Sequence, residues 1–143
     1  MGIQALRADH RVIVRLVAGV RGCAAGLKTR GDGLELVALL GRLDRRLIDH
    51  LAAEDEGLYP ALAQSDDPAL RRAAEEAIRD LGGLKEAWRA YLARWDLEAM
   101  LAAPEVFRAT TAALMSAIVF RIELEEATLY PLAAELALEG AAA

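Results

Sequence analysis

The spacing of the apolar residues restricts the fold most, because they recur at alternating intervals of three and four along four stretches of the chain. This spacing places them on one face of a helix that packs in a bundle. No stretch shows the strict alternation of a half-buried strand. We therefore predict an all-α fold, an antiparallel up-down-up-down four-helix bundle. The four predicted seams are Ile3, Leu6, His10, Ile13, Val17, Val20, Ala24 and Leu27; Leu36, Leu40, Leu43, Leu47, His50, Glu54 and Leu58; Leu70, Ala74, Ala77, Leu81, Leu84, Trp88, Tyr91 and Trp95; and Phe107, Thr110, Leu114, Ala117, Arg121, Leu124 and Thr128.

Short links with recognisable turn chemistry separate the predicted helices. The segment 31–33, Gly-Asp-Gly, interrupts the pattern after the first helix. Asp67 is suited to cap the third helix and Pro68 to occupy its first position, and Pro104 opens the fourth helix after a looser connection over 96–103. With 143 residues, 55% of them hydrophobic, the chain can bury a full core. We predict a single domain over 1–143.

Composition excludes several classes of partner. The single cysteine, Cys23, cannot form an internal disulfide, and no charged-then-apolar leader begins the chain, so we expect a cytoplasmic protein. The longest nearly uncharged apolar run, Ala112 to Phe120, is far shorter than the roughly 20 residues that cross a bilayer. The net charge of -5 offers little attraction to phosphate backbones. We predict neither a membrane span nor a nucleic-acid partner.

Polar residues occupy positions on the predicted seams where apolar ones are expected: His10, His50, Glu54 and Arg121. Burying an unpartnered polar group costs roughly 1–3 kcal/mol on protein mutational scales, and an unpaired charge costs more. A lone core histidine, or a His–Glu pair at i, i+4, is most often structural. Two imidazoles and two carboxylates together form a suitable donor set for divalent iron, manganese or zinc. The cluster therefore indicates a metal site more strongly than its members do.

A similar segment occurs twice in the chain, and the difference between the copies that matters for metal binding is at their first position. Leu-Tyr-Pro at 58–60 matches Leu-Tyr-Pro at 129–131, and acidic residues precede both. His50 in the first copy matches Arg121 in the second. An imidazole can bind a metal, whereas a guanidinium has no lone pair to offer. The first copy thus has the character of half a metal site, and the second does not.

Together with the Asp-His pair at 9–10, these motifs resemble the hemerythrin-like, or HHE cation-binding, domain family over nearly the whole chain. The resemblance implies a bundle that holds two irons and binds oxygen or related small ligands. It assigns one metal to His10 and His50, with Glu54 and Glu126 as bridging carboxylates. The second metal would need two histidines on the third helix and one on the fourth. The chain has only two histidines, and Gly82-Gly83 and Arg121 stand near the missing positions.

Two interpretations follow from this half-complete pattern. In the first, at most one divalent ion (iron, zinc or manganese) binds at His10, His50, Glu54 and Glu126, in a sensor of the metal or of a small ligand that the sequence does not identify. In the second, Arg121 replaces the metal as counter-ion of the carboxylates, Glu125 included, in a metal-free structural or interaction module. Glu54, Glu126 and Arg121 sum to one negative charge, which one protonated histidine balances. Neither interpretation predicts an enzyme, although a mononuclear iron enzyme is a minor alternative.

Two further features concern space and partners. The Gly82-Gly83 pair costs roughly 1 kcal/mol per residue in a helix, so it makes room for Arg121, a close helix crossing or a small cavity, or is a mild kink without function. The fourth helix carries more apolar residues than one stripe needs. We predict a homodimer through this helix, or else a more deeply buried helix, with a contact formed by Met115, Ile118, Val119 and Ile122.

Overall fold

The computed structural model describes residues 2–135, and this part of the chain is helical with no strands. The all-α prediction is confirmed. The elements in chain order are α1 (Ile3–Ala25), α2 (Arg30–Ala53), the π-helical turn η1 (Glu54–Leu58), α3 (Tyr59–Ala63), α4 (Pro68–Leu81), α5 (Leu84–Arg94), α6 (Leu97–Ala102), α7 (Pro104–Leu124) and the π-helical turn η2 (Glu125–Leu129). Residues 136–143 of the predicted domain lie outside the described part.

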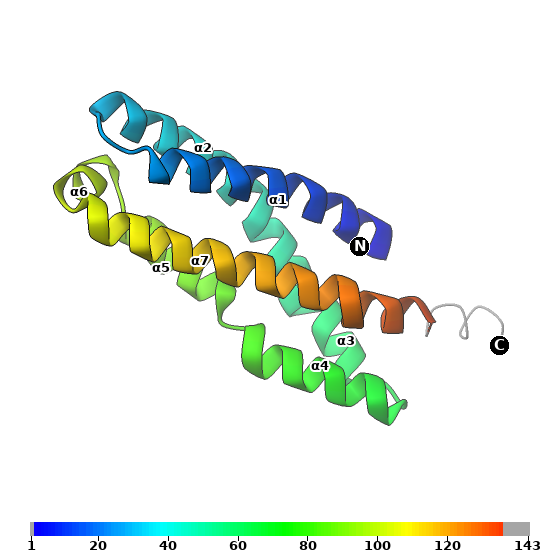
Figure 1. Cartoon of the computed structure of the whole chain (residues 1–143). Coiled ribbons are helices and arrows are strands. Elements are labelled where there is room, and N and C mark those ends of the chain that lie inside the picture. The colour runs from blue at the N-terminus through cyan, green and yellow to red at the C-terminus, as the bar shows by residue number, and fades with distance from the viewer. Residues whose placement is uncertain (1, 136–143) are drawn as a thin grey trace.

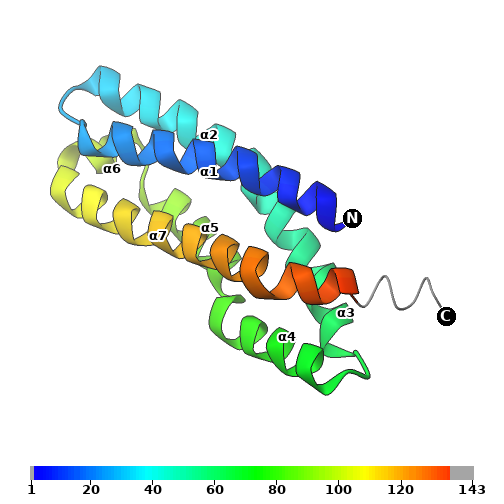
Figure 2. The same cartoon turned by 45° about the vertical axis from the view of Figure 1, so that its right-hand side comes forward.

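Four helices surround the main core. Helix α1 packs against α2 and α7, and α5 packs against the same two helices from the opposite side (Figures 1 and 2). The shorter α3 and α4 pack on each other and continue the core beyond the start of α5, away from α6. The start of α1 and the end of α7 lie at the same end of the molecule. Among the described residues, no helix combines the length and the apolar character that crossing a bilayer requires.

The predicted third helix is two helices, because the chain breaks at Gly82-Gly83 between α4 and α5. A Cβ atom on Gly82 would lie 2.4 Å from the carbonyl oxygen of Ile78, a backbone atom that cannot move aside independently. A Cβ atom on Gly83 would meet open space. The prediction of one continuous helix was therefore wrong, although its buried face was predicted correctly, and Gly82 is the residue that the break requires.

Helix boundaries follow the predicted capping residues with one exception. Asp67 accepts from the Ala69 N–H at the start of α4, and Pro68 is its first residue, as predicted. The break expected at 31–33 was wrong, since α2 already begins at Arg30. A capping box accounts for this: the Thr29 hydroxyl accepts from the Asp32 N–H, and the Asp32 carboxylate accepts from the Thr29 N–H. The connection over 96–103 contains the short helix α6.

Helix α7 buries a different stripe from the predicted one. Its buried residues are Phe107, Thr111, Met115, Ile118, Arg121 and Ile122, whereas Thr110 and Ala117 of the predicted seam are exposed. A helix with apolar residues on several sides fits more than one stripe, so spacing alone selected the wrong one. Met115, Ile118 and Ile122 belong to the protein's own core. A homodimer stays a prediction, and those three side chains are not on a free surface.

A polar layer separates the largest of the three apolar clusters of the core from a smaller one. On α1, His10 lies between Leu6 of the smaller cluster and Ile13 of the larger one. The larger cluster holds Trp88 and Trp95, which confirms that these aromatics fill the core. The smaller cluster consists of Leu6, Tyr59, Ala77, Leu81, Leu129 and Tyr130. The layer between the clusters contains the residues that the sequence singled out.

Candidate metal centre

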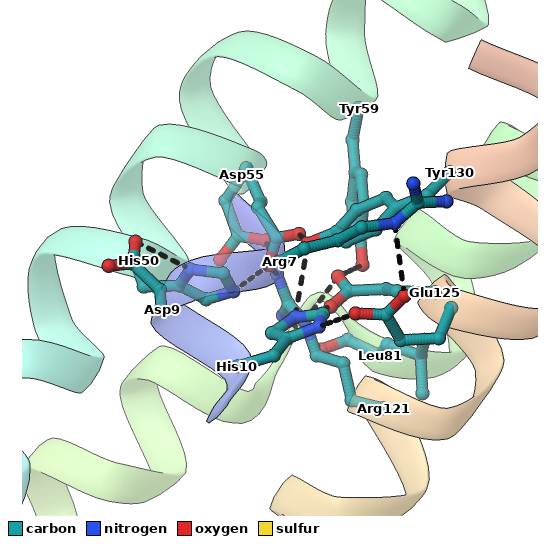
Figure 3. A network of polar contacts seen from close by, with 12 residues as sticks. Arg7, Asp9, His10, His50, Asp55, Tyr59, Leu81, Arg121, Glu125 and Tyr130 are labelled. Atoms are coloured by element: carbon teal, nitrogen blue, oxygen red, sulfur yellow. Dashed lines mark hydrogen bonds and ion pairs between the residues drawn. The ribbon is translucent and has the colours of Figure 1, made fainter. Parts of the chain in front are cut away.

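Four side chains from four elements converge in this polar layer. His10 comes from α1, His50 from the last turn of α2, Glu54 from the first position of η1, and Glu125 from the first position of η2. All four are at most 3% exposed. One potential ligand atom from each lies within 4.8 Å of the others. Figure 3 shows three of them, His10, His50 and Glu125, turned toward a common centre.

The doubled segment forms a doubled π-helical turn. In the first copy the Tyr59 N–H donates to the Glu54 carbonyl, and in the second the Tyr130 N–H donates to the Glu125 carbonyl, five residues back in each case. Proline follows each tyrosine and has no N–H for the regular ladder, which favours a local departure from it. In a regular α-helix, positions five apart point about 140° away from each other. The wider turn brings Glu and Tyr of each copy toward the same layer, and such turns often occur at functional sites.

The tyrosines then pair crosswise with the glutamates. The Tyr130 hydroxyl donates to Oε2 of Glu54 at 2.5 Å, and the Tyr59 hydroxyl donates to Oε2 of Glu125. Each copy thus supplies the hydroxyl that holds the carboxylate of the other. Burial and the adjacent carboxylates raise the pKa of both phenols above their ordinary value, so both stay protonated and donate.

Carboxylates outside the layer orient both histidines. The Nδ1 atom of His50 lies 3.1 Å from Oδ2 of Asp9, and the Nδ1 atom of His10 lies 2.7 Å from Oε1 of Glu126. When Nδ1–H donates to a carboxylate, the neutral ring keeps its lone pair on Nε2. Both Nε2 atoms face the layer, 3.0 Å from Oε1 of Glu54 for His50 and 3.0 Å from Oε1 of Glu125 for His10.

These two contacts bring a nitrogen lone pair against a carboxylate oxygen, unless a cation lies between them. The Nε2 atom of His50 is buried and, despite its 3.0 Å approach to Glu54, has no hydrogen bond of acceptable geometry. A proton on the ring or a metal ion between the ligands removes the repulsion. Although burial disfavours the charged ring, the Glu54 carboxylate holds the pKa of His50 above its ordinary value. A proton or a metal ion would therefore stabilise the contact between His50 and Glu54.

Arg121 occupies the other side of both glutamates. Its Nε donates to Oε2 of Glu125 at 3.2 Å, and its Nη2 lies 2.8 Å from Oδ1 of Asp55 and 3.4 Å from Oε1 of Glu54. Its Nη1 donates to the Leu81 carbonyl at 3.1 Å, at the end of α4 next to the helix break. The guanidinium also lies over the Tyr59 ring, 4.9 Å from the centroid. Every donating edge of this buried cation has a partner (Figure 3).

The two buried glutamates titrate in opposite directions. Although burial opposes ionisation, the close approach and charge of His50 hold the pKa of Glu54 below its ordinary value. Burial raises the pKa of Glu125, and the Glu54 charge adds to this rise. Adjacent carboxylates behave in this way because ionising one disfavours ionising the other. Glu54 is thus the firmer anion of the pair.

The structure places most of the sequence-predicted residues together and moves one outward. His10, His50, Glu54, Arg121 and Glu125 lie in the buried layer. The side chain of Glu126 is 38% exposed and contacts Nδ1 of His10 and Nε of Arg7, so Glu125 takes the inner position that the resemblance gave to Glu126. Sequence spacing missed the roles of Asp9, Asp55, Tyr59 and Tyr130. The signal for the two tyrosines was present in the repeated Leu-Tyr-Pro.

The donor set could hold a divalent metal ion. Ligand atoms bound at about 2.1 Å and at right angles to each other are about 3.0 Å apart, which matches both histidine–carboxylate separations. Two imidazole nitrogens and two carboxylate oxygens suit iron, manganese or zinc. Both histidines of the chain belong to this set, and Arg121 fills the place of further ligands. An ion at this centre would have His10, His50, Glu54 and Glu125 as ligands.

The family model described as the hemerythrin HHE cation binding domain matches residues 1–133. The comparisons with curated proteins and with solved structures gave no match.

Proposed function

The chain belongs to the hemerythrin HHE cation-binding domain family, and we propose that it binds one divalent metal ion at His10, His50, Glu54 and Glu125. In this proposal the long helices form an antiparallel bundle around the ion, and the protein senses the metal or a small ligand of it. Domains of this family are typically non-enzymatic binders of metal or oxygen. Iron is the metal that the family implies, and zinc and manganese suit the same donors.

The buried Nε2 atom of His50 carries this proposal. It lies 3.0 Å from Oε1 of Glu54 without a hydrogen bond, while Asp9 holds the opposite ring nitrogen. Metal-binding histidines have this arrangement, in which an outer carboxylate orients the ring and leaves one lone pair for the ion. His10 repeats the outer carboxylate with Glu126, whereas its Nε2 atom lies 3.0 Å from both Oε1 of Glu125 and the Tyr130 hydroxyl. A histidine kept only for packing would not need an outer carboxylate and an unpaired inner nitrogen.

The charge of the layer also favours a dication. Glu54, Glu125 and Asp55 contribute three negative charges and Arg121 one positive charge, so the layer carries a net charge of -2 when both imidazoles are neutral. Counting Asp55, which the sequence did not reveal as a partner, changes the earlier balance. One dication neutralises the layer, as do two protonated histidines. A single protonated histidine leaves a buried negative charge.

Arg121 explains why we propose one ion and not two. It engages Oε2 of Glu125 together with Tyr59, which leaves Oε1 of Glu125 facing His10. The guanidinium and an ion at the histidines thus use different oxygens of Glu125. Glu54 is the more constrained residue, because Oε1 faces both His50 and Nη2 of Arg121. When bound, the ion supplies Lewis acidity and, if it is iron, redox chemistry. The protein residues orient the ligands and keep bulk water out.

Metal analysis of protein purified without a chelating tag tests the proposal. After incubation with ferrous iron, manganese or zinc and removal of excess metal, we expect about one equivalent of at least one metal. His50→Ala removes a ligand and should abolish the stoichiometric binding. The matched control Glu75→Gln removes an exposed acid on α4 and should leave metal content unchanged. Less than about a tenth of an equivalent with all three metals, or equal content in His50→Ala, would refute the proposal.

The second candidate function is a metal-free interaction module in which Arg121 alone balances the carboxylates. The observation that favours it is the complete pairing of the Arg121 guanidinium with Glu125, Asp55 and the Leu81 carbonyl. In that case both imidazoles carry protons at neutral pH. Nuclear magnetic resonance of the two imidazole rings decides between the candidates. Two imidazolium rings at pH 7 that do not respond to added metal would favour the second.

A further inference from the structure

The outer surface between α1 and α2 contains a groove of about 540 Å³ that the metal centre does not use. Arg42, Arg45, Arg46 and Asp49 line it from α2, at positions i, i+3, i+4 and i+7, which share one helix face. Asp9, Val12 and Leu16 line it from α1. Ligand pockets commonly occupy about 300–1,000 Å³, so the groove has the size for a small molecule.

The groove is locally basic in an acidic protein. Three arginines and two aspartates give it a net charge of +1, whereas the chain as a whole carries -5. Within residues 2–135, no carboxylate lies at ion-pair distance from Arg42 or Arg45, and Arg46 pairs only loosely, with Nη1 3.6 Å from Oδ1 of Asp9. Guanidinium groups without a close carboxylate partner are suited to bind oxyanions, because their planar donors match two oxygens of a phosphate or carboxylate at once.

The remaining groups of the groove restrict which anion fits. Asp49 and Asp9 place carboxylates beside the arginines, which disfavours an extended polyanion and suits the hydroxyl groups of a compact ligand. Val12 and Leu16 offer a short apolar surface between the charges. A phosphate group attached to a small polyhydroxylated skeleton satisfies all three kinds of contact. Inorganic phosphate satisfies only the first.

The groove also adjoins the metal centre through one residue. Asp9 faces the groove with Oδ1, near Arg46, and holds Nδ1 of His50 with Oδ2. An anion that draws Arg46 toward itself leaves Asp9 more strongly bound to His50, because one competing cation is withdrawn. We propose that this groove binds a small phosphorylated polyhydroxy compound through Arg42, Arg45 and Arg46, next to the carboxylate that orients His50. The proposal does not depend on whether a metal binds.

Calorimetric titration of the full-length protein tests the groove, with EDTA present so that metal binding cannot contribute. The probes are a hexose monophosphate, the same hexose without phosphate, and inorganic phosphate. We expect saturable binding of the hexose monophosphate, at least about tenfold weaker binding of inorganic phosphate, and no binding of the free hexose. The variant Arg42→Gln/Arg45→Gln should weaken hexose monophosphate binding by at least about tenfold.

The matched control is Arg72→Gln/Arg89→Gln, which removes the same charge from exposed positions on α4 and α5. It should change the affinity by less than about twofold, because distant surface charges are largely screened at physiological salt. Equal weakening in both double variants would overturn the proposal, since it would show only general charge attraction. Absence of saturable binding at millimolar probe would overturn it as well. Equal affinity for inorganic phosphate would overturn recognition of the organic skeleton.

Discussion

Replacing Arg121 with methionine tests the central physical claim about the buried layer. Methionine has a similar length and no charge, so Arg121→Met removes the only guanidinium that contacts Glu125, Asp55 and Glu54 within the described residues. Removing one partner of a buried ion pair costs about 3–5 kcal/mol, because the other charge is left uncompensated. Since Asp55 is 18% exposed and gains solvent, the two glutamates carry most of this cost.

The expected loss is large enough to measure by urea unfolding of the metal-free protein at pH 7. With a denaturant slope of about 2 kcal/mol per molar urea, a loss of 3–5 kcal/mol lowers the midpoint by about 1.5–2.5 M. The control Arg72→Met, at an exposed position on α4, should change the free energy of unfolding by no more than about 0.5 kcal/mol. If Arg121→Met does not fold, Arg121→Lys, which keeps the charge and loses the fork, should show a smaller loss.

A double variant separates the charge effect from lost packing. Glu125→Gln removes a carboxylate that Arg121 balances, so Arg121→Met/Glu125→Gln should be less unstable than the sum of the single variants by about 1–2 kcal/mol. The reasoning is refuted if Arg121→Met lies within about 1 kcal/mol of the unmodified protein with an unchanged slope. Strict additivity in the double variant would attribute the loss to packing alone.

Three further predictions concern pH, the helix break and the crossed tyrosines. The pKa of His50 is raised above 6.5, so its contribution to metal-free stability is present below that pH and is lost as pH rises through the folded-state pKa. The pKa of Glu54 is lowered below 4.5, so its contribution is lost as pH falls through its folded-state pKa. Thermal midpoints of the metal-free protein should therefore fall on both sides of a maximum, and His50→Gln should flatten the alkaline side. Gly82→Ala should cost about 1–3 kcal/mol of stability, because its Cβ would press on the Ile78 carbonyl. Gly83→Ala should change stability by less than about 1 kcal/mol, and equal effects of the two variants in urea unfolding would contradict this account. Tyr130→Phe should cost about 1–3 kcal/mol of stability and more than Tyr91→Phe, because Tyr130 donates to a buried carboxylate and Tyr91 bonds only the Thr111 hydroxyl. A smaller loss of stability in Tyr130→Phe than in Tyr91→Phe would show that Glu54 does not need this donor.

Sequence spacing predicted the buried faces well wherever a helix has one apolar stripe. Every residue of the α1 seam from Leu6 to Leu27 is buried, and so is every residue of the predicted third seam from Leu70 to Trp95. The same method failed on α7, where Thr110 was assigned inward and Thr111 is the buried residue. Since α7 is apolar on several sides, the choice among its stripes depends on packing against α1 and α5, which spacing does not contain.

The inner glutamate, Glu125 at the start of η2, lies four residues after the buried Arg121, so the regular helical period of α7 continues to it. The match between the two copies of the repeat aligns Glu54 with Glu125, and both of these glutamates are fully buried, whereas the family resemblance pointed to Glu126. The π-helical turn at 125–129 adds a residue to the period after Glu125 and brings the Tyr130 hydroxyl to the same layer. The outer partners Asp9 and Asp55 come from different helices, so their roles depend on tertiary contacts that one sequence does not show.

The break in the predicted third helix and the pairing of Arg121 are structurally linked. Helix α4 ends beside Gly82, and the Leu81 carbonyl there accepts from Nη1 of Arg121. A continuous helix would engage that carbonyl in its own ladder, so the break supplies an acceptor to a cation that already has Glu125 and Asp55. Each glutamate accepts a hydrogen bond from the tyrosine of the other copy of the repeat, and these two bonds hold both glutamates in place. Arg121 therefore balances the carboxylates on one side of the layer, and on the other side the histidines face those carboxylates in an arrangement that could hold a metal ion.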